Sequence, residues 1–229
     1  MNTSTPRSDA RFEAVARTSR AADSAPRVIG IDVGGSAKGF HAVLLAGSEL
    51  LERRHDRDPV ALAAWCATRH ATVVAVDAPC RWRPPPPAPA RAAERALAAE
   101  GISCYFTPTE ARARSHPFYS WMLPGAALFD ALRPHYALYD GDATLRPLCI
   151  ETFPHAVACA LAGAPVSAKD KKPLRANLLR LAGMSIDGTE TMDELDALLC
   201  ALAASAFAQG RFRAFGAPAD GFIVVPAAP

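Results

Sequence analysis

Several features that mark other protein classes are scarce in this sequence. Half of its 229 residues are hydrophobic, yet no apolar run reaches the length of a membrane span, which favours a soluble globular protein with no membrane partner. The six cysteines form no Cys-x-x-Cys pair and are scattered through apolar segments, as is typical of core thiols in a reducing cytosol. The net charge of only +2 neither requires nor excludes a nucleic-acid partner, since a local basic patch matters more than the total. We therefore expect a cytoplasmic protein.

Residues 1–26 lack hydrophobic periodicity and contain no apolar block of the kind that a secretory signal needs. Because they are rich in Ser, Thr, Ala and Arg, we expect a disordered tail. Residues 27–229 are numerous enough to bury one large core, and we expect a single α/β domain there, with an insertion at about 81–146.

The clearest feature that is present is the stretch 28–35, Val-Ile-Gly-Ile-Asp-Val-Gly-Gly. Its apolar residues predict a buried strand that presents Asp32 at one end, while Gly34 and Gly35 allow a sharp turn or the close approach of a ligand. A carboxylate at this place requires a cation, a hydrogen-bond donor or water. Taken alone, the motif fits a turn, a phosphate loop or a metal site.

Two further strands are predicted at 39–46 and 49–55, and their short connections imply an antiparallel meander with the first strand. A helix opened by Pro59 separates the meander from residues 72–76, which are apolar and β-branched and lead into Asp77. A helical crossover makes this new strand parallel to the first. The acids that end the two strands should then emerge at the same edge of the sheet, where open α/β sheets place their sites.

Residues 81–146 have a different character: a proline run, a helix-like segment at 89–100, and then aromatic and basic residues interleaved. We interpret them as an insertion or lid over the sheet edge. Exposed rings between arginines can stack bases and hold phosphates. The same residues fit the packing of a small helical subdomain, and packing is the favoured interpretation for Phe118, Trp121, Leu128 and Phe129.

A strand is predicted again at 148–152, where Glu151 lies near its end, and Pro154 opens the helix that follows. Residues 169–175 carry the densest positive charge in the chain and lead into another helix. Because a helix dipole disfavours cations at its N-terminus, an anionic partner explains this segment at least as well as a solvated surface does.

The sequence Thr191-Met192-Asp193-Glu194 fits a capping box and predicts a long last helix at about 192–209. Asp193 and Asp196 are three residues apart and share one face of that helix. Residues 221–225 suggest a short edge strand.

Five carboxylates are thus candidates for one catalytic cluster at the sheet edge: Asp32, Asp77, Glu151, Asp193 and Asp196. Like charges packed together repel and raise one another's pKa unless a cation lies between them. Hard oxygen ligands suit Mg²⁺ or Mn²⁺, and two such ions about 4 Å apart activate water and stabilise the leaving oxygen of a phosphodiester.

With these motifs in order, the sequence resembles the family named domain of unknown function 429. The resemblance is carried by six segments: GIDVGGSAKGF (30–40), VAVDAP (74–79), RAAERAL (91–97), GISCYFTP (101–108), IETFPH (150–155) and DELDALLCALAA (193–204). Together they span nearly everything after the tail. The resemblance implies a ribonuclease H-like mixed sheet, a three-stranded antiparallel meander plus parallel strands flanked by helices, and a predicted nuclease activity.

Carried onto this chain, the resemblance makes Asp32 and Asp77 the acids of the first and fourth strands, and Asp193 and Asp196 the acids of the closing helix. Glu151 resembles a further acid of the family. Four more residues match family positions whose role is undefined, and we expect them to contact substrate: Arg91, Arg95, Tyr105 and Thr107.

The leading hypothesis is a metal-dependent nuclease in which Asp32, Asp77, Asp193 and Asp196 hold the metal ions. Water attacks the phosphorus while the substrate backbone is held by Lys171, Lys172 and Arg175. One alternative is an actin-like or sugar-kinase-type ATP-binding phosphotransferase, although no second phosphate loop stands out and that class needs two such domains. Another is a non-catalytic module that binds nucleic acid through its basic segment.

Overall fold

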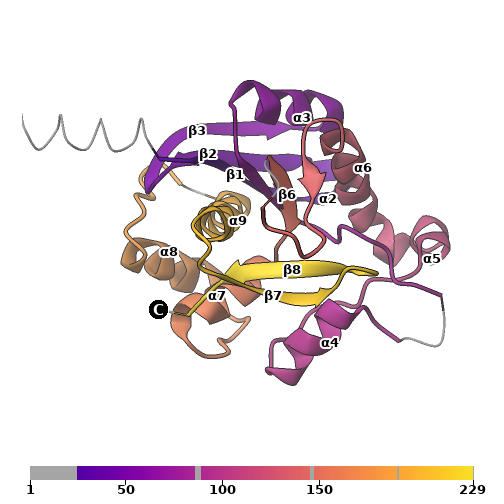
Figure 1. The fold of residues 1–229 in the computed structure, drawn as a ribbon. Coiled ribbons are helices and arrows are strands. Elements are labelled where there is room, and N and C mark those ends of the chain that lie inside the picture. The colour runs from indigo at the N-terminus through magenta and orange to yellow at the C-terminus, as the bar shows by residue number, and fades with distance from the viewer. Residues whose placement is uncertain (1–24, 86–88, 145–146, 190, 229) are drawn as a thin grey trace, which may run out of the picture.

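The protein is described here from a computed structural model that covers residues 25–85, 89–144, 147–189 and 191–228. Residues 1–24, which make up nearly all of the predicted tail, lie outside the described residues. The described residues form one mixed sheet with helices on both faces (Figure 1).

The sheet has eight strands: β1 (Arg27–Val33), β2 (Phe40–Ala46), β3 (Glu49–Asp56), β4 (Val73–Asp77), β5 (Ala137–Leu138), β6 (Leu148–Glu151), β7 (Phe212–Ala217) and β8 (Gly221–Pro226). Its order is β3-β2-β1-β4-β6-β8-β7, with the short β5 also paired to β6. Strands β1, β2 and β3 form an antiparallel meander, and β4 and β6 run parallel to β1. The predicted fold class, a meander plus parallel strands flanked by helices, is confirmed.

The predicted edge position of residues 221–225 is wrong. These residues lie in β8, which is parallel to β6 and antiparallel to β7, so the edge of the sheet is β7. Strand β7 lacks a clear alternation of apolar and polar residues, and for that reason the sequence pattern did not reveal it. A tight turn from Ala217 to Gly221 joins the two strands as a hairpin.

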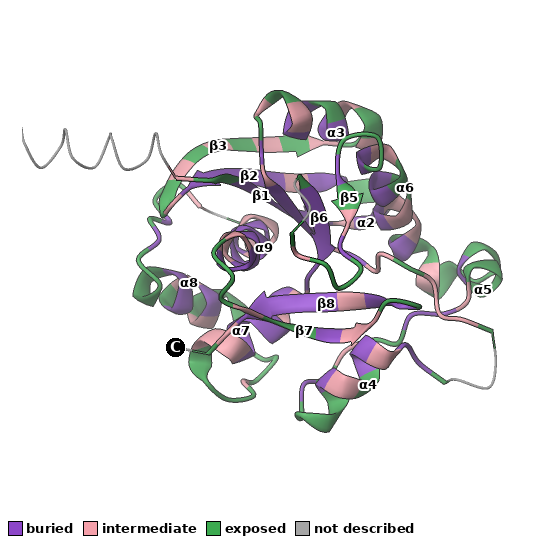
Figure 2. Cartoon of the chain, viewed as in Figure 1, coloured by how far each residue is buried: buried purple, intermediate pink, exposed green. Residues whose placement is uncertain are grey.

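Alternate residues of the central strands face two separate cores. One core contains Ile29 and Ile31 of β1 and is covered by α3 (Pro59–Thr68) and α6 (Leu123–Leu132). The other contains Val28 and is covered chiefly by α9 (Met192–Ala208), with α4 (Ala92–Ala99), α7 (Pro154–Ala162) and α8 (Lys171–Leu181) around it. Figure 2 shows the buried strands between these helical layers. In the part of the chain that the structure covers, no helix has both the length and the apolar character needed to cross a membrane.

Helix α9 lies directly on β1 because Gly30 has no side chain. A Cβ atom added there would lie 2.1 Å from the backbone nitrogen of Ala201 and 2.2 Å from the carbonyl oxygen of Ala197. Any larger residue would push the helix away from the strand. This close approach brings the first turn of α9 to the end of β1, where Asp32 lies. The N-terminus of α9 has the predicted capping box, in which Thr191 and Glu194 cap one another's backbone.

The segment 81–146 contributes both to the core and to the surface. It contains α4, α5 (Glu110–Ser115), the 3₁₀ helix η1 (Pro117–Met122) and α6. Leu128 and Phe129 are on the buried face of α6, which confirms the packing interpretation for these two residues. For Phe118 and Trp121 that interpretation is wrong, because both side chains are exposed: they belong to a 3₁₀ turn at the rim of the domain instead of to a helix that faces the sheet.

Candidate functional site: an acidic edge of the sheet

Asp32 and Asp77 lie side by side at the carboxyl ends of β1 and β4. The two residues are paired in the parallel register, so their side chains leave the same face of the sheet from strands that are about 5 Å apart. Val28 and Val73, at even spacings before them, belong to the core beneath α9. Both carboxylates therefore point to the face that α9 covers.

Burial raises the pKa of both acids, and each acid raises that of its neighbours. The pKa of Asp32 is raised from 3.8 to about 7 by burial and by the nearby negative charge of Asp193, although Lys38 and Arg175 act in the opposite direction. Burial and the charges of Asp32 and Glu151 raise the pKa of Asp77 well above its ordinary value, against the opposing charges of Arg175 and Lys171. Burial is thus the larger cause of both shifts, and repulsion between neighbouring acids adds to it.

The first two turns of α9 add Asp193 and Asp196 to this edge, and each is engaged by a cation. Lys38 Nζ lies 3.0 Å from both carboxylate oxygens of Asp193, and His41 Nε2 lies 3.7 Å from one of them. The guanidinium of Arg175 donates a hydrogen bond to Asp196. All four acids that were predicted as metal ligands thus lie near this edge of the sheet, with two basic side chains interposed among them.

The three predicted basic contacts lie in different environments. Lys171 and Lys172 are exposed in the first turn of α8, next to the acidic edge. Arg175, one turn later, is buried against Asp196, so it neutralises the acids instead of reaching outward as a contact for a nucleic-acid backbone would.

Glu151 is held apart from the four aspartates by the register of β6. It pairs with Val76, one residue before Asp77, and so its side chain leaves the opposite face of the sheet. There both of its oxygens accept hydrogen bonds from Arg91, at 2.5 and 2.8 Å, and one also accepts the backbone N–H of Cys80 at 2.8 Å. These donors leave the carboxylate little capacity for a metal ion.

Arg91 is 1% exposed and connects three elements of the fold. Besides Glu151 it contacts Glu94, with Nε donating at 2.9 Å, and its Nη1 lies 3.4 Å from the carbonyl oxygen of Asp220 in the β7–β8 turn. Glu94 in turn accepts the backbone N–H of Thr107 at 2.9 Å. The structure therefore gives Arg91 a bracing position, in which every nitrogen of its guanidinium donates a hydrogen bond within the fold.

The other predicted substrate contacts differ in exposure. Arg95 is exposed on α4, with its guanidinium donating to the carbonyl oxygen of Ala90. Tyr105 is 70% exposed, whereas Thr107 is buried beside it.

Sequence reasoning missed two residues of the acidic edge, Lys38 and His41. His41 is paired with Asp32 across the β1–β2 hairpin, and burial lowers its pKa below the ordinary value of 6.5. The short connection between the two strands is the signal that would have found it, because counting across the hairpin places position 41 opposite position 32.

Oxygen donors of four aspartates suit Mg²⁺ or Mn²⁺ chemically, and a bound cation would lower the pKa values that burial and neighbouring acids raise in Asp32 and Asp77. In the arrangement described, however, no group of three or more His, Cys, Asp or Glu side chains is positioned to hold a metal ion within the described ranges. The donor chemistry therefore suits such an ion, while Asp193 and Asp196 are held against Lys38 and Arg175 in the arrangement described.

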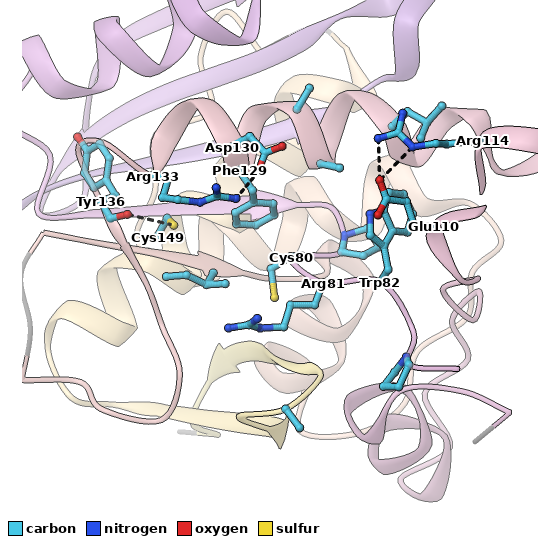
Figure 3. A pocket seen from close by; sticks show the side chains of 17 residues that line it. Cys80, Arg81, Trp82, Glu110, Arg114, Phe129, Asp130, Arg133, Tyr136 and Cys149 are labelled. Carbon is cyan, nitrogen blue, oxygen red and sulfur yellow. Dashed lines mark hydrogen bonds and ion pairs between the residues drawn. The ribbon is translucent and has the colours of Figure 1, made fainter. Parts of the chain in front are cut away.

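A cavity of about 770 Å³ lies near the β4–α4 connection, away from the four aspartates (Figure 3). Its wall carries two ion pairs, Arg114 with Glu110 and Arg133 with Asp130, and the exposed Arg81. None of the four aspartates lines it, so it is separate from the acidic edge.

Comparisons with known proteins give one family and a likeness of fold. The model of the family described as "Protein of unknown function (DUF429)" matches residues 9–221. Two solved structures are similar at low identity: the Thermus thermophilus RuvC structure (18% identity, 80% of this chain and 96% of that chain, TM-score 0.42) and T. thermophilus RuvC in complex with Holliday junction substrate (17%, 81% and 96%, 0.43). A search of curated proteins found no match.

Proposed function

This chain belongs to the DUF429 family, whose model matches residues 9–221, and on that premise we propose that it is a metal-dependent nuclease whose acidic edge hydrolyses phosphodiester bonds. One observation carries the proposal. Asp32 and Asp77 are neighbours in register, their pKa values are raised, and α9 adds Asp193 and Asp196 to the same face. A structural role alone does not require such an excess of negative charge at a partly open edge.

The residues that would hold Mg²⁺ or Mn²⁺ are Asp32, Asp77, Asp193 and Asp196. When bound there, the metal would supply an activated water and stabilise the leaving oxygen. His41 is a candidate proton acceptor, because its lowered pKa keeps the ring neutral at physiological pH and it lies opposite Asp32 in the sheet.

The proposed substrate is a nucleic acid, held beside the acids by the exposed Lys171 and Lys172 at the start of α8. Lys171 lowers the pKa of Asp77, so its charge acts on the acidic edge itself. Cations in this place neutralise a phosphate backbone and supply binding that depends on salt. A cytoplasmic location is also part of the proposal, supported by six free cysteines, which suit a reducing compartment.

A second candidate function, a non-catalytic nucleic-acid-binding module, is favoured by one specific observation. Lys38 and Arg175 already pair with two of the four acids, as they would in a domain that holds no metal. The two candidates differ in their response to metal, because a binding module keeps its affinity for nucleic acid and shows no turnover with any divalent ion.

The proposed activity is tested by incubating the purified chain with Mg²⁺ or Mn²⁺ and labelled single-stranded, duplex, hybrid and branched nucleic acids. Asp32→Asn and Asp77→Asn should each reduce the metal-dependent cleavage rate by about 100-fold, since each removes a ligand. The matched control is Asp130→Asn, an exposed acid of α6 outside the acidic edge. Absence of cleavage on every substrate, or equal rates for the wild type and Asp32→Asn, would exclude the nuclease.

A further inference from the structure

Three exposed aromatic rings gather at the rim of the domain, from two segments that are separate in the sequence. Tyr105 is 70%, Phe118 51% and Trp121 36% exposed. The rings of Tyr105 and Phe118 meet edge to face with centroids 5.8 Å apart, and Phe118 meets Tyr119 in the same way at 5.0 Å. Large rings exposed together cost hydration free energy unless a ligand covers them.

This aromatic rim borders a small pocket that also reaches the acidic edge. The pocket, of about 70 Å³, is lined by Tyr105, Trp121, Thr107, Phe153 and Asp77, and the Arg91–Glu151 ion pair contributes to its wall. A ligand group bound in this pocket would therefore lie next to the carboxylate of Asp77.

Trp121 also contacts the loop that follows Asp32. A Cβ atom added at Gly35 would lie 3.6 Å from Cβ of Trp121, so η1 packs against the short helix α2 (Gly35–Lys38). This contact places Trp121 beside the loop that follows Asp32.

The pocket wall also holds a buried polar group without a partner among the described residues. Thr107 is buried, and its hydroxyl has no hydrogen-bond partner within the part of the chain that the structure describes. Buried hydroxyls without a partner are rare because they lose hydration without compensation. The backbone N–H of Thr107 is already used by Glu94, which holds the residue in place.

We propose that this pocket is a nucleobase subsite: Tyr105 and Trp121 stack on one unpaired base, and Thr107 bonds to its edge. This inference rests on the proposed function and deepens it by naming the substrate class, nucleic acid with an unpaired nucleotide next to the scissile phosphate. An unpaired base offers a free face to an aromatic ring and a free Watson–Crick edge to a hydroxyl. A base within a duplex offers only its groove edges, and no free face, unless it is flipped out.

The experiment measures binding without turnover. Fluorescence anisotropy in EDTA follows the wild-type chain with a fluorescein-labelled oligonucleotide of about 12 nucleotides, as DNA and as RNA, single-stranded or annealed to its complement. The single strands should bind about tenfold more tightly than the duplexes. Replacing Tyr105 by Ala should weaken single-strand binding about tenfold, with little effect on duplex binding.

Two further variants sharpen the result. Phe106→Ala is the matched control, since Phe106 is an exposed neighbour of Tyr105 that does not line the pocket, and it should bind as the wild type does. Thr107→Val removes the hydroxyl at nearly constant volume. It should weaken single-strand binding severalfold while raising the melting temperature, because an unpartnered buried hydroxyl is removed. A purely structural threonine would not produce these opposite signs.

The outcomes separate this inference from the proposed nuclease. If Tyr105→Ala binds single strands as the wild type does, or if no oligonucleotide is bound, the subsite is excluded even where metal-dependent cleavage is observed. If single strands bind through Tyr105 and no metal supports cleavage, the subsite stands and the nuclease fails. Cleavage that is lost in Asp32→Asn and prefers single strands through Tyr105 supports both.

Discussion

Two clusters of acids lie at the ends of neighbouring strands, one at Glu151 of β6 and one at Asp77 of β4. Their negative charges are neutralised in different ways. In the first, Glu94 and Glu151 surround Arg91, and every nitrogen of its guanidinium contacts an oxygen. In the second, four aspartates share Lys38 and Arg175. The first cluster is closed to solvent, and the second opens at the partly exposed Asp77.

The two arginines report the difference directly. Burial tends to lower the pKa of Arg91, but Glu151 and Glu94 more than offset it and raise that pKa above the ordinary value. For Arg175 burial prevails, and its pKa is lowered despite the attraction of Asp77 and Asp32. An acidic cluster with balanced charge braces a fold, whereas one with raised acid pKa values is prepared to accept another cation.

The largest effect is expected from breaking the balanced cluster. Arg91→Met leaves Glu94 and Glu151 buried without a counter-charge and should lower the free energy of unfolding by about 3–5 kcal/mol, measured by urea denaturation. Arg95→Met, an exposed arginine on the same helix, is the control and should cost less than about 1 kcal/mol. Equal losses for the two variants would contradict a bracing role for Arg91.

The cluster of four aspartates should lose less stability when its arginine is replaced, and Mg²⁺ should restore part of that loss. Arg175→Met should cost about 2 kcal/mol, since Asp196 is partly exposed and can be rehydrated. Millimolar Mg²⁺ should then raise the melting temperature of Arg175→Met more than that of the wild type, because binding to the folded state adds stability by mass action. Lys38→Met, which breaks an exposed ion pair, is the milder control. A variant that Mg²⁺ does not stabilise would count against a metal site at the acidic edge.

The last prediction concerns the ionisation of Asp32 and depends on pH. Its pKa is about 7 in the folded protein and 3.8 ordinarily, so its stabilising contribution is present below pH 3.8 and is lost as the pH rises through 7. In EDTA at pH 8, Asp32→Asn should therefore be more stable than the wild type by about 1 kcal/mol or more, and the difference should vanish near pH 4. Asp130→Asn should show no such dependence on pH. If Asp32→Asn is instead less stable than the wild type at pH 8, the ionised carboxylate of Asp32 is stabilised by its neighbours and the prediction is wrong.

Local patterns in the sequence were sufficient to predict the elements whose formation depends on residues close together in the chain. The capping box of α9, the short links of the meander and the helical crossover into β4 each have a local cause, and together they placed Asp32 and Asp77 at one edge. The crossover predicts that the two acids emerge at the same edge, and the structure adds that they are partners in the parallel register.

What the sequence by itself determined is therefore the fold class and the pairing of the strand-end acids. The tertiary structure alone decided which acids share a face and which cation meets each acid. Strand β6 also ends in an acid, but a register offset of one residue sends Glu151 to the opposite face, to Arg91. Because side chains alternate along a strand, one step of register reverses a residue's environment, and pairing over 60 positions depends on packing that no local pattern records.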